Sequence, residues 1–243
     1  MPRFFVEKNK IDVNNGLILL DGENAMHLMG VLRARTGDEV VICDGDGIDY
    51  ICKITEGDKK NAVLEITETK PNETEPDLKL TLYQGIAKGE KNDFVIQKAV
   101  EIGYCRIVPV ATEFTVVKLD GKEEKKLERW NKIARSAAEQ SQRGIIPRVE
   151  AVMNFKEAVN NANEDLLIIP YEKENSLSIK QAISGFKGKS IGVFIGPEGG
   201  FSFDEIKLAD ENNIKSVTLG KRILRSETAG LVAGAVCLYE LEE

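Results

Sequence analysis

The chain has 243 residues, of which 42% are hydrophobic and 30% charged, a composition typical of a globular protein with one large domain or two modest ones. Its formal net charge of −7 disfavours a protein that binds nucleic acid through bulk electrostatics. Residues 1–77 contain 9 Lys and Arg against 16 Asp and Glu, whereas residues 78–150 contain 14 against 10. An anionic polymer is therefore expected to bind the middle of the chain or a local basic patch.

Membrane and metal chemistry are both disfavoured by the sequence. No run approaches the roughly 18 consecutive apolar residues of a membrane span, and the N-terminal sequence MPRFFVEKNK lacks the apolar core of a signal peptide. We therefore expect a cytoplasmic protein. The four cysteines are scattered and His27 is the sole histidine, which favours reduced thiols over a metal site or a disulfide framework.

The N-terminal part reads as short strands separated by turn clusters such as Asp-Gly-Asp-Gly at 44–47. One helical pattern interrupts them from Glu23 to Arg35, with Ala25, Leu28, Met29 and Leu32 on one face. We expect a small β-barrel or sandwich over residues 1–70. The polar, proline-containing segment 71–77 predicts a linker. The expected strands are 4–6, 17–20, 39–43, 49–55 and 62–69.

After the linker, apolar runs alternate with helical patterns over residues 78–243. This alternation predicts an α/β domain with an open, mostly parallel sheet covered on both faces. Ligands bind such sheets at the carboxyl ends of the strands. The expected strands are 80–87, 107–111, 166–170, 191–195 and 216–219, and the expected helices are 90–102, 123–142, 155–163, 203–212 and 226–241.

The first candidate site is the stretch FIGPEGGFS at 194–202. A strand ends at Gly196, and the pair Ser202 and Glu205 forms a capping box that places a helix start at Phe203. The glycines let a ligand approach the backbone amides closely. Because Glu198 would repel a phosphate, a neutral or cationic ligand is favoured there. A tight structural turn explains the glycines equally well.

The second candidate site is LGKRILRSETAG at 219–230, where another strand ends at a glycine and a helix begins near Ser226, a good N-cap residue. Lys221, Arg222 and Arg225 read as solvated surface charge by default. The position of Arg225 after a strand's carboxyl end favours a functional role. The following helix, 229–237, is apolar on every side, which predicts burial in a core or a subunit interface.

Together, GPEGGFSFDEI and LGKRILRSETAG resemble the signature of the SPOUT class of methyltransferases, and within it the family that methylates N3 of a uridine in 16S ribosomal RNA. Less specific matches at 27–33, 88–91, 97–103 and 130–143 extend the resemblance over nearly the whole chain. It implies an N-terminal PUA-like β-barrel for RNA (1–70), a linker (71–77) and a C-terminal SPOUT domain (78–243). It also implies a trefoil knot in that domain and a homodimer.

The resemblance further implies S-adenosylmethionine as cofactor. Because methylation of N3 removes a weakly acidic imide proton, Arg225 is a candidate to orient the uracil or stabilise the anion at N3, and Glu198 a candidate base or orienting group. Two alternatives stay open: a SPOUT enzyme acting on another RNA position, and a non-catalytic RNA-binding or ribosome-assembly protein of this fold. The RNA contacts expected are Arg33, Arg35, Lys88 and Arg143. The cofactor residues expected are Ile169, Pro170, Tyr171, Gly196, Pro197, Glu198, Gly199, Gly200, Leu219, Gly220, Ile223, Leu224 and Arg225.

Overall fold

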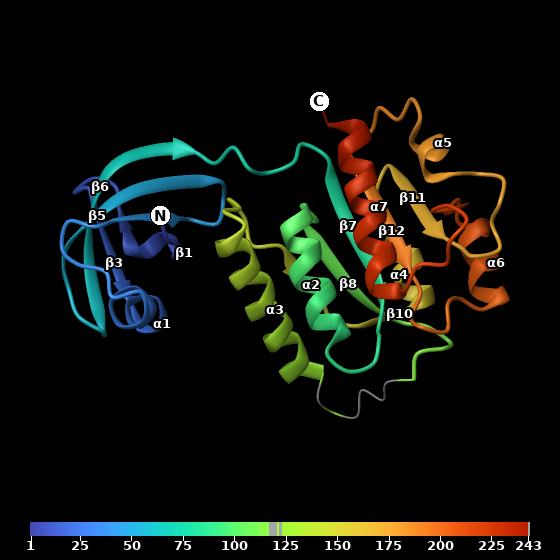
Figure 1. The fold of residues 1–243 in the computed structure, drawn as a ribbon, viewed down its shortest axis with the longest axis horizontal. Coiled ribbons are helices and arrows are strands. Elements are labelled where there is room, and N and C mark those ends of the chain that lie inside the picture. Colours follow the sequence, from blue (N-terminus) through green and yellow to red (C-terminus); the bar gives the residue numbers. More distant parts are fainter. Residues whose placement is uncertain (117–120, 122, 243) are drawn as a thin grey trace. The chain divides into compact units, whose positions relative to one another are not determined.

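The computed structural model describes residues 1–116, 121 and 123–242, which form two compact units (Figure 1). Unit 1 consists of Met1–Glu75 together with Ala138–Ile146, and unit 2 of Pro76–Ala137 together with Pro147–Glu243. The chain thus returns to unit 1 at Ala138, within the last turn of the helix Glu123–Gln140, which a division at residues 71–77 does not anticipate. Across the described ranges, no helix is long and apolar enough to cross a membrane.

Unit 1 is built on a six-stranded sheet of order β1-β4-β5-β6-β3-β2, in which β1 and β4 are parallel and the other pairs antiparallel. Side chains alternate between the two faces of the sheet along β3. Ile18 and Leu20 are buried on the core face, whereas Leu17 and Leu19 are exposed on the other face. The strands are β1 (Arg3–Phe5), β2 (Ile11–Asp12), β3 (Leu17–Asp21), β4 (Glu39–Cys43), β5 (Ile48–Gly57) and β6 (Asn61–Pro71), with a short 3-10 turn, η1, at Lys8–Lys10.

The helix expected from Glu23 to Arg35 is shorter and partly π-helical. α1 (Gly22–Ala25) continues into the π-helical turn η2 (Met26–Val31), and the N–H of Leu32 donates to the carbonyl of His27 at 2.9 Å. A π-turn is wider than an α-turn, so residues after it rotate off the expected face. Leu28 is buried as predicted, but Leu32 is 47% exposed. Arg33 then adopts a left-handed backbone conformation with φ +57°.

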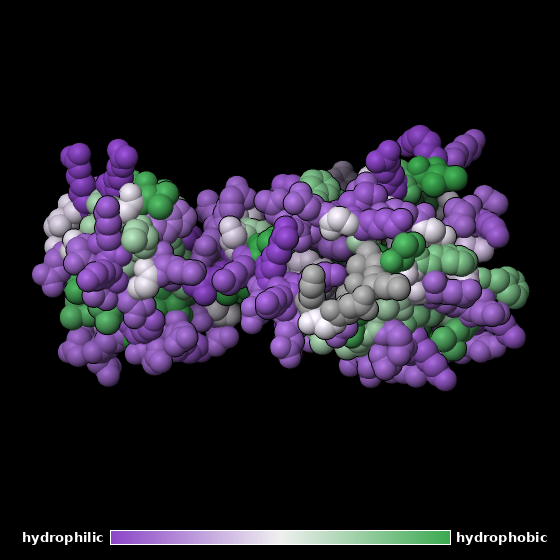
Figure 2. Space-filling view, turned by 90° about the horizontal axis from the view of Figure 1, so that it is seen from below, coloured by the Kyte–Doolittle hydropathy of each residue, from purple (hydrophilic) through white to green (hydrophobic). Residues whose placement is uncertain are grey.

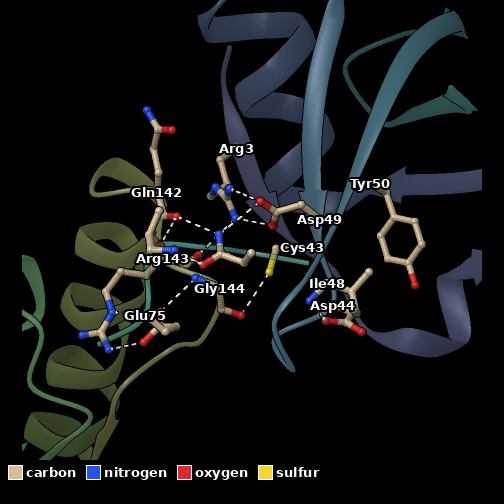
Figure 3. A network of polar contacts seen from close by, with 12 residues as sticks. Arg3, Cys43, Asp44, Ile48, Asp49, Tyr50, Glu75, Gln142, Arg143 and Gly144 are labelled. Atoms are coloured by element: carbon tan, nitrogen blue, oxygen red, sulfur yellow. Dashed lines mark hydrogen bonds and ion pairs between the residues drawn. The ribbon is translucent and has the colours of Figure 1, made fainter. Parts of the chain in front are cut away.

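The returning segment 138–146 is fastened to unit 1 by buried charged groups (Figure 3). Arg3 donates to both Asp49 oxygens at 2.7 and 2.6 Å and to the carbonyl of Arg143 at 3.1 Å. Arg143 in turn donates to Glu75 at 3.1 and 2.6 Å. Removing buried charges from water is costly unless they are paired, so these groups hold the segment in one place.

The expected linker is partly bound within unit 1 rather than being a free spacer. β6 extends to Pro71, and the Asn72 amide donates to Asp49 at 3.1 Å and to the carbonyl of Gln142 at 3.2 Å. Glu75 also accepts hydrogen bonds from the backbone N–H groups of Gly144 and Ile145. The polar composition of this segment therefore reflects specific hydrogen bonds, which its sequence pattern alone does not distinguish from solvation.

Unit 2 contains a parallel sheet of order β10-β8-β7-β12-β11-β13, with β9 paired to β8, so the predicted α/β architecture is confirmed. The strands are β7 (Lys79–Gly85), β8 (Arg106–Ala111), β9 (Arg148–Val149), β10 (Met153–Asn154), β11 (Leu166–Pro170), β12 (Ser190–Ile195) and β13 (Lys215–Val217). The helices are α2 (Lys91–Ile102), α3 (Glu123–Gln140), α4 (Phe155–Asn161), α5 (Ile179–Ile183), α6 (Phe203–Glu211) and α7 (Ser226–Leu241). β9, β10 and α5 were not predicted, since each is too short to show periodicity.

Helix α7 packs tightly because its small residues admit a buried tyrosine. A Cβ atom at Gly234 would lie 2.5 Å from the Tyr104 ring, and the Tyr104 hydroxyl donates to the carbonyl of Gly230 at 2.7 Å. Of the two locations predicted for residues 229–237, a core accounts for the buried Ala233, Gly234 and Cys237, whereas Ala235 is exposed in the single chain and leaves the prediction of a subunit interface untested. Figure 2 shows one face of the molecule, on which hydrophobic side chains lie among predominantly hydrophilic ones.

Candidate functional site

Three loops at the carboxyl ends of neighbouring strands of unit 2 enclose a cavity of about 740 Å³. They follow β11, β12 and β13, as expected for a ligand site on a parallel sheet. The cavity is large enough for a small-molecule ligand of cofactor size, for which roughly 300–1,000 Å³ is usual. Its lining comprises Pro170–Glu172, Asn175, Ile195–Phe201, Thr218–Glu227, Ala229 and Lys91.

The glycine turn after β12 depends on glycine for its packing. A Cβ at Gly85, at the end of β7, would lie 2.5 Å from the Pro197 nitrogen, and a Cβ at Gly196 would lie 2.9 Å from the Gly200 carbonyl carbon. Gly200 has φ +71°, a conformation that disfavours other residues. The two interpretations of these glycines are therefore compatible, because the turn packs closely and also lines the cavity.

The helix start after this turn is confirmed. The Ser202 hydroxyl accepts from the Glu205 N–H at 3.3 Å, and the Glu205 carboxylate accepts from the Ser202 N–H at 2.9 Å. The other Glu205 oxygen accepts from the backbone N–H of Glu113 at 2.9 Å, so one buried carboxylate also fixes the turn that follows β8. The capping box thus holds two loops at the same edge of the sheet.

The role predicted for Ser226 is wrong in one respect. Arg225 is the N-cap residue of α7, and Ser226 is its first helical residue. The Ser226 hydroxyl donates to the carbonyl of Gly196 at 2.5 Å and accepts from the Gln84 amide at 2.9 Å. The hydroxyl of an N-cap residue accepts a hydrogen bond from a backbone N–H of its own helix. The Ser226 hydroxyl instead joins the glycine turn and β7 to the start of α7.

Glu198 is engaged by neighbouring cations and amides. Its carboxylate accepts from the Lys91 ammonium at 2.9 Å and from the Lys88 N–H at 3.2 Å. Partial burial alone would raise the pKa of the Glu198 carboxyl, but these hydrogen bonds hold the pKa below its ordinary value. A carboxylate with a low pKa is a weak proton acceptor. The geometry therefore favours an orienting role for Glu198 over a role as base.

Four charged side chains of alternating sign, Glu198, Lys91, Glu227 and Arg225, line the cavity one after another. The Lys91 ammonium lies 3.8 Å from one Glu227 oxygen, and the Arg225 guanidinium lies 3.9 Å from the other. Arg225 itself is 82% exposed, so its guanidinium is accessible to a ligand. Lys91 and Glu227 are not among the residues predicted for the site, although both lie inside the stretches that carry the resemblance.

All the expected cofactor residues line the cavity except Ile169, which is completely buried in β11. Successive side chains of the strand 166–170 point to opposite faces of the sheet, and Ile169 packs into the core. Pro170 and Tyr171 lie at the end of β11, where the cavity begins. Of the lining residues outside the expected set, Glu172, Asn175 and Thr218 lie in loops with no recognisable motif. Only the three-dimensional arrangement of the loops identifies them.

The expected RNA contacts differ in accessibility. Arg33 and Arg35 are exposed in unit 1, and Lys88 is exposed in unit 2. Arg143 is 3% exposed and its guanidinium is bonded to Glu75. Its side chain therefore stabilises unit 1, and the structure argues against a direct contact between Arg143 and RNA. A lone arginine after a helix gives no sequence signal that separates these roles.

Comparisons with known proteins identify the family to which the chain is related. Residues 74–238 match the family model described as "RNA methyltransferase domain", and residues 20–67 match "RNA methyltransferase PUA domain". The chain is 34% identical to ribosomal RNA small subunit methyltransferase E of Bacillus subtilis, with 100% of this chain and 98% of the relative covered. It is 35% identical to the protein of the same name from Mesomycoplasma hyopneumoniae, with 99% and 100% covered.

A solved structure is similar over the whole chain. The crystal structure of a ribosomal RNA small subunit methyltransferase E from Neisseria gonorrhoeae bound to S-adenosyl methionine superposes with a TM-score of 0.87 at 33% identity. The alignment covers 97% of this chain and 96% of that one. With the family models, the full-length relatives and this shared fold in agreement, the chain belongs to the ribosomal RNA small subunit methyltransferase E family of RNA methyltransferases.

Proposed function

We propose that this protein transfers a methyl group from S-adenosylmethionine to N3 of one uridine in 16S ribosomal RNA, in the cytoplasm. The observation that carries the proposal is the 740 Å³ cavity, where the glycine turn and the loop 218–227 meet at the carboxyl edge of the sheet. Family membership supports the reaction class, and the relatives' name supports a small-subunit ribosomal RNA substrate. The uridine N3 position comes from the sequence resemblance.

The lining of the cavity fits S-adenosylmethionine. This cofactor supplies a methyl group activated by a sulfonium cation and carries no phosphate, so a cavity wall with Glu172, Glu198 and Glu227 is compatible with it. The backbone at 196–200 and 219–224 would hold it, because a glycine-rich turn exposes amides to a ligand. The N. gonorrhoeae relative, 33% identical, was solved with this molecule bound.

Arg225 is the group that we assign to the reacting base. Uridine N3 carries a weakly acidic imide proton, and negative charge develops on the uracil ring as that proton leaves. A guanidinium that donates hydrogen bonds to the ring stabilises this charge. Arg225 lines the cavity and is 82% exposed, so it can reach a base presented there. Glu198 is assigned to hold the segment 88–91 against the glycine turn.

Ribosomal RNA is proposed to bind Arg33 and Arg35 of unit 1 and Lys88 of unit 2. All three side chains are exposed, so their charged groups are accessible to RNA phosphates. Arg33 also follows a π-turn, a feature common at functional sites. Its φ of +57° marks the end of that helix, where the N–H of Ala34 donates to the carbonyl of Leu28 at 3.1 Å.

We also propose that the protein is a homodimer and that residues 78–243 contain the trefoil knot of the SPOUT class. Thr228, Val232, Ala235 and Tyr239 follow one another at helical spacing on α7, and each is at least partly exposed. Tyr239 alone is 86% exposed. A partly apolar helical stripe of this kind supports contact with a second copy. Sedimentation of the purified protein tests it, and a monomer at micromolar concentration would contradict it.

The central experiment is mass spectrometry of small-subunit ribosomal RNA from a strain that lacks the gene. We expect 3-methyluridine to disappear from one position and to return with the wild-type gene but not with Arg225→Ala. A full level of 3-methyluridine in the deletion strain would overturn the assignment. Loss of a different methylated nucleotide would instead identify an enzyme acting on another RNA position.

A second experiment separates an enzyme from a non-catalytic RNA-binding protein. Saturating S-adenosylmethionine should raise the melting temperature, since a ligand at 100 times its Kd contributes about 2.7 kcal/mol of stability. Gly196→Ala should weaken this shift, because the added Cβ would contact the Gly200 backbone at 2.9 Å. Glu73→Gln, an exposed change in unit 1, serves as the matched control. No shift in the wild type would favour the non-catalytic protein.

A further inference from the structure

A turn beside the glycine turn presents an aromatic side chain in a fixed position. The turn Thr112–Thr115 follows β8, and the Thr112 N–H donates to the Thr115 hydroxyl at 2.9 Å while the Thr115 N–H donates to the Thr112 carbonyl at 3.0 Å. Between them, the Glu113 N–H is held by the Glu205 carboxylate at 2.9 Å. The backbone on both sides of Phe114 is therefore fixed by specific hydrogen bonds.

Phe114 lies directly against the glycine turn and yet remains 43% exposed. A Cβ at Gly199 would lie 2.8 Å from the Phe114 Cβ, so glycine at 199 is required for this close approach. Single exposed apolar residues are common on proteins and need no explanation by themselves. What sets Phe114 apart is its position at the edge of the cofactor cavity described above.

A second, shallow cavity of about 490 Å³ adjoins Phe114. It is lined by Glu113, Phe114, Thr115, Val116, Glu198 and Gly199. Glu198 and Gly199 also line the 740 Å³ cavity, so the two cavities share a wall. A ligand in the shallow cavity would therefore be a direct neighbour of a molecule bound in the larger one.

The chemistry of the shallow cavity fits a flat, uncharged group that donates hydrogen bonds. An aromatic ring offers a stacking surface, the carboxylates of Glu113 and Glu198 are acceptors, and no lysine or arginine is among the described residues that line it. A phosphate would be repelled by this lining. RNA-binding proteins stack unpaired bases on aromatic side chains, and enzymes that modify a base take it out of its stack.

We infer that Phe114 is the stacking surface for the extruded pyrimidine base of the RNA substrate. The inference rests on the proposed function, which it extends by naming the residue that receives the base. The shared wall of Glu198 and Gly199 places the base next to the cofactor cavity. Phe114 is thus a substrate-binding residue that sets preference for a flat base, distinct from Arg225, which stabilises charge on it.

The test measures the binding of two RNA fragments by Phe114→Ala, Phe114→Trp and the wild type. One fragment carries the target uridine, and the other is identical but abasic at that position. Phe114→Ala should weaken binding of the uridine RNA about tenfold, the loss typical of one base–aromatic stack, and leave binding of the abasic RNA unchanged. Phe114→Trp should retain the affinity for the uridine RNA, because its ring also stacks.

Two results would overturn the inference: equal affinity of Phe114→Ala and wild type for the uridine RNA, or an equal loss on both RNAs. Titration with S-adenosylmethionine provides the control for folding, since Phe114 does not line the larger cavity and its loss should leave that Kd unchanged. A change in that Kd would also count against the assignment. If the wild type methylates no ribosomal RNA, the proposed function fails; an active wild type with an unaffected Phe114→Ala refutes only this inference.

Discussion

The hydroxyl of Ser226 donates a hydrogen bond to the carbonyl of Gly196 across 30 residues of sequence, at an O···O distance of 2.5 Å. The same hydroxyl accepts from the Gln84 amide, so it joins the ends of two strands to the first turn of α7. The contact with Gln84 is buried and the contact with Gly196 is partly buried, and a buried polar group left without its partner costs about 1–3 kcal/mol. Ser226 therefore fixes the position of the glycine turn relative to the loop 218–225, which precedes α7.

Ser226→Ala tests this link. The change should lower the free energy of unfolding by about 1–3 kcal/mol, because Gly196 and Gln84 lose a buried partner. It should also weaken S-adenosylmethionine binding, since the glycine turn lines the cavity. Isothermal calorimetry and urea unfolding measure the two effects. Ser136→Ala, the same change at an exposed serine of α3, is the control, and an equal effect of both changes would argue against the link.

Arg225→Ala should abolish methyl transfer while leaving stability within about 0.5 kcal/mol of the wild type, as is usual for an exposed surface residue. Arg225 is 82% exposed and its side chain makes no capping hydrogen bond, so little folding energy depends on it. A methyl-transfer assay and a thermal melt give the two values. Lys187→Ala, which removes an exposed cation of unit 2 away from the cavity, is the control. Near-normal turnover by Arg225→Ala would remove Arg225 from the mechanism.

The Glu75–Arg143 pair predicts a defined pH dependence of stability. Burial alone would raise the pKa of the Glu75 carboxyl, but the Arg143 guanidinium and the N–H groups of Gly144 and Ile145 hold it below its ordinary value of 4.5. Because the folded pKa is lower than the unfolded one, the pair stabilises the protein above about pH 4.5. That stabilisation is lost as the pH falls through the folded pKa.

Glu75→Gln should therefore cost about 3 kcal/mol at neutral pH, since it leaves a buried guanidinium without its carboxylate. The difference from wild type should shrink as the pH falls below about 4.5. Urea unfolding across this range measures it, with the exposed Glu73→Gln as control. A difference that stayed constant with pH would show that the ion pair is not its source.

Two substitutions at Arg33 distinguish the effect of its backbone conformation on stability from the effect of its guanidinium on RNA binding. Arg33→Gly should raise the free energy of unfolding by roughly 1 kcal/mol relative to Arg33→Ala, because only glycine adopts φ +57° without strain. Both variants lose the guanidinium and should weaken RNA binding equally. Unfolding and RNA-binding titrations of the two variants measure this. RNA affinity at the wild-type level in both would contradict a role for Arg33 in binding.

The elements that could be predicted from the amino-acid pattern are those whose pattern is long and locally encoded. The alternation of apolar runs and helical periods over residues 78–243 sufficed for the parallel α/β sheet, and Ser202 with Glu205 located the start of α6. The carboxylate of Glu198 disfavours a phosphate ligand by its local charge alone. These features depend on the residues of one segment, and their physical cause is contained in that segment.

The way in which distant segments are joined follows from the tertiary fold. Arg143 can be buried because its guanidinium is paired with Glu75. The Ser226 hydroxyl donates to the carbonyl of Gly196 instead of capping its own helix, and the Glu198 carboxylate accepts a hydrogen bond from Lys91. In each case the partner lies 30 or more residues away in the sequence. The free energy of a polar side chain depends on the charges and hydrogen-bond partners that folding brings to it. Because these partners are distant in the sequence, the local amino-acid pattern does not identify them.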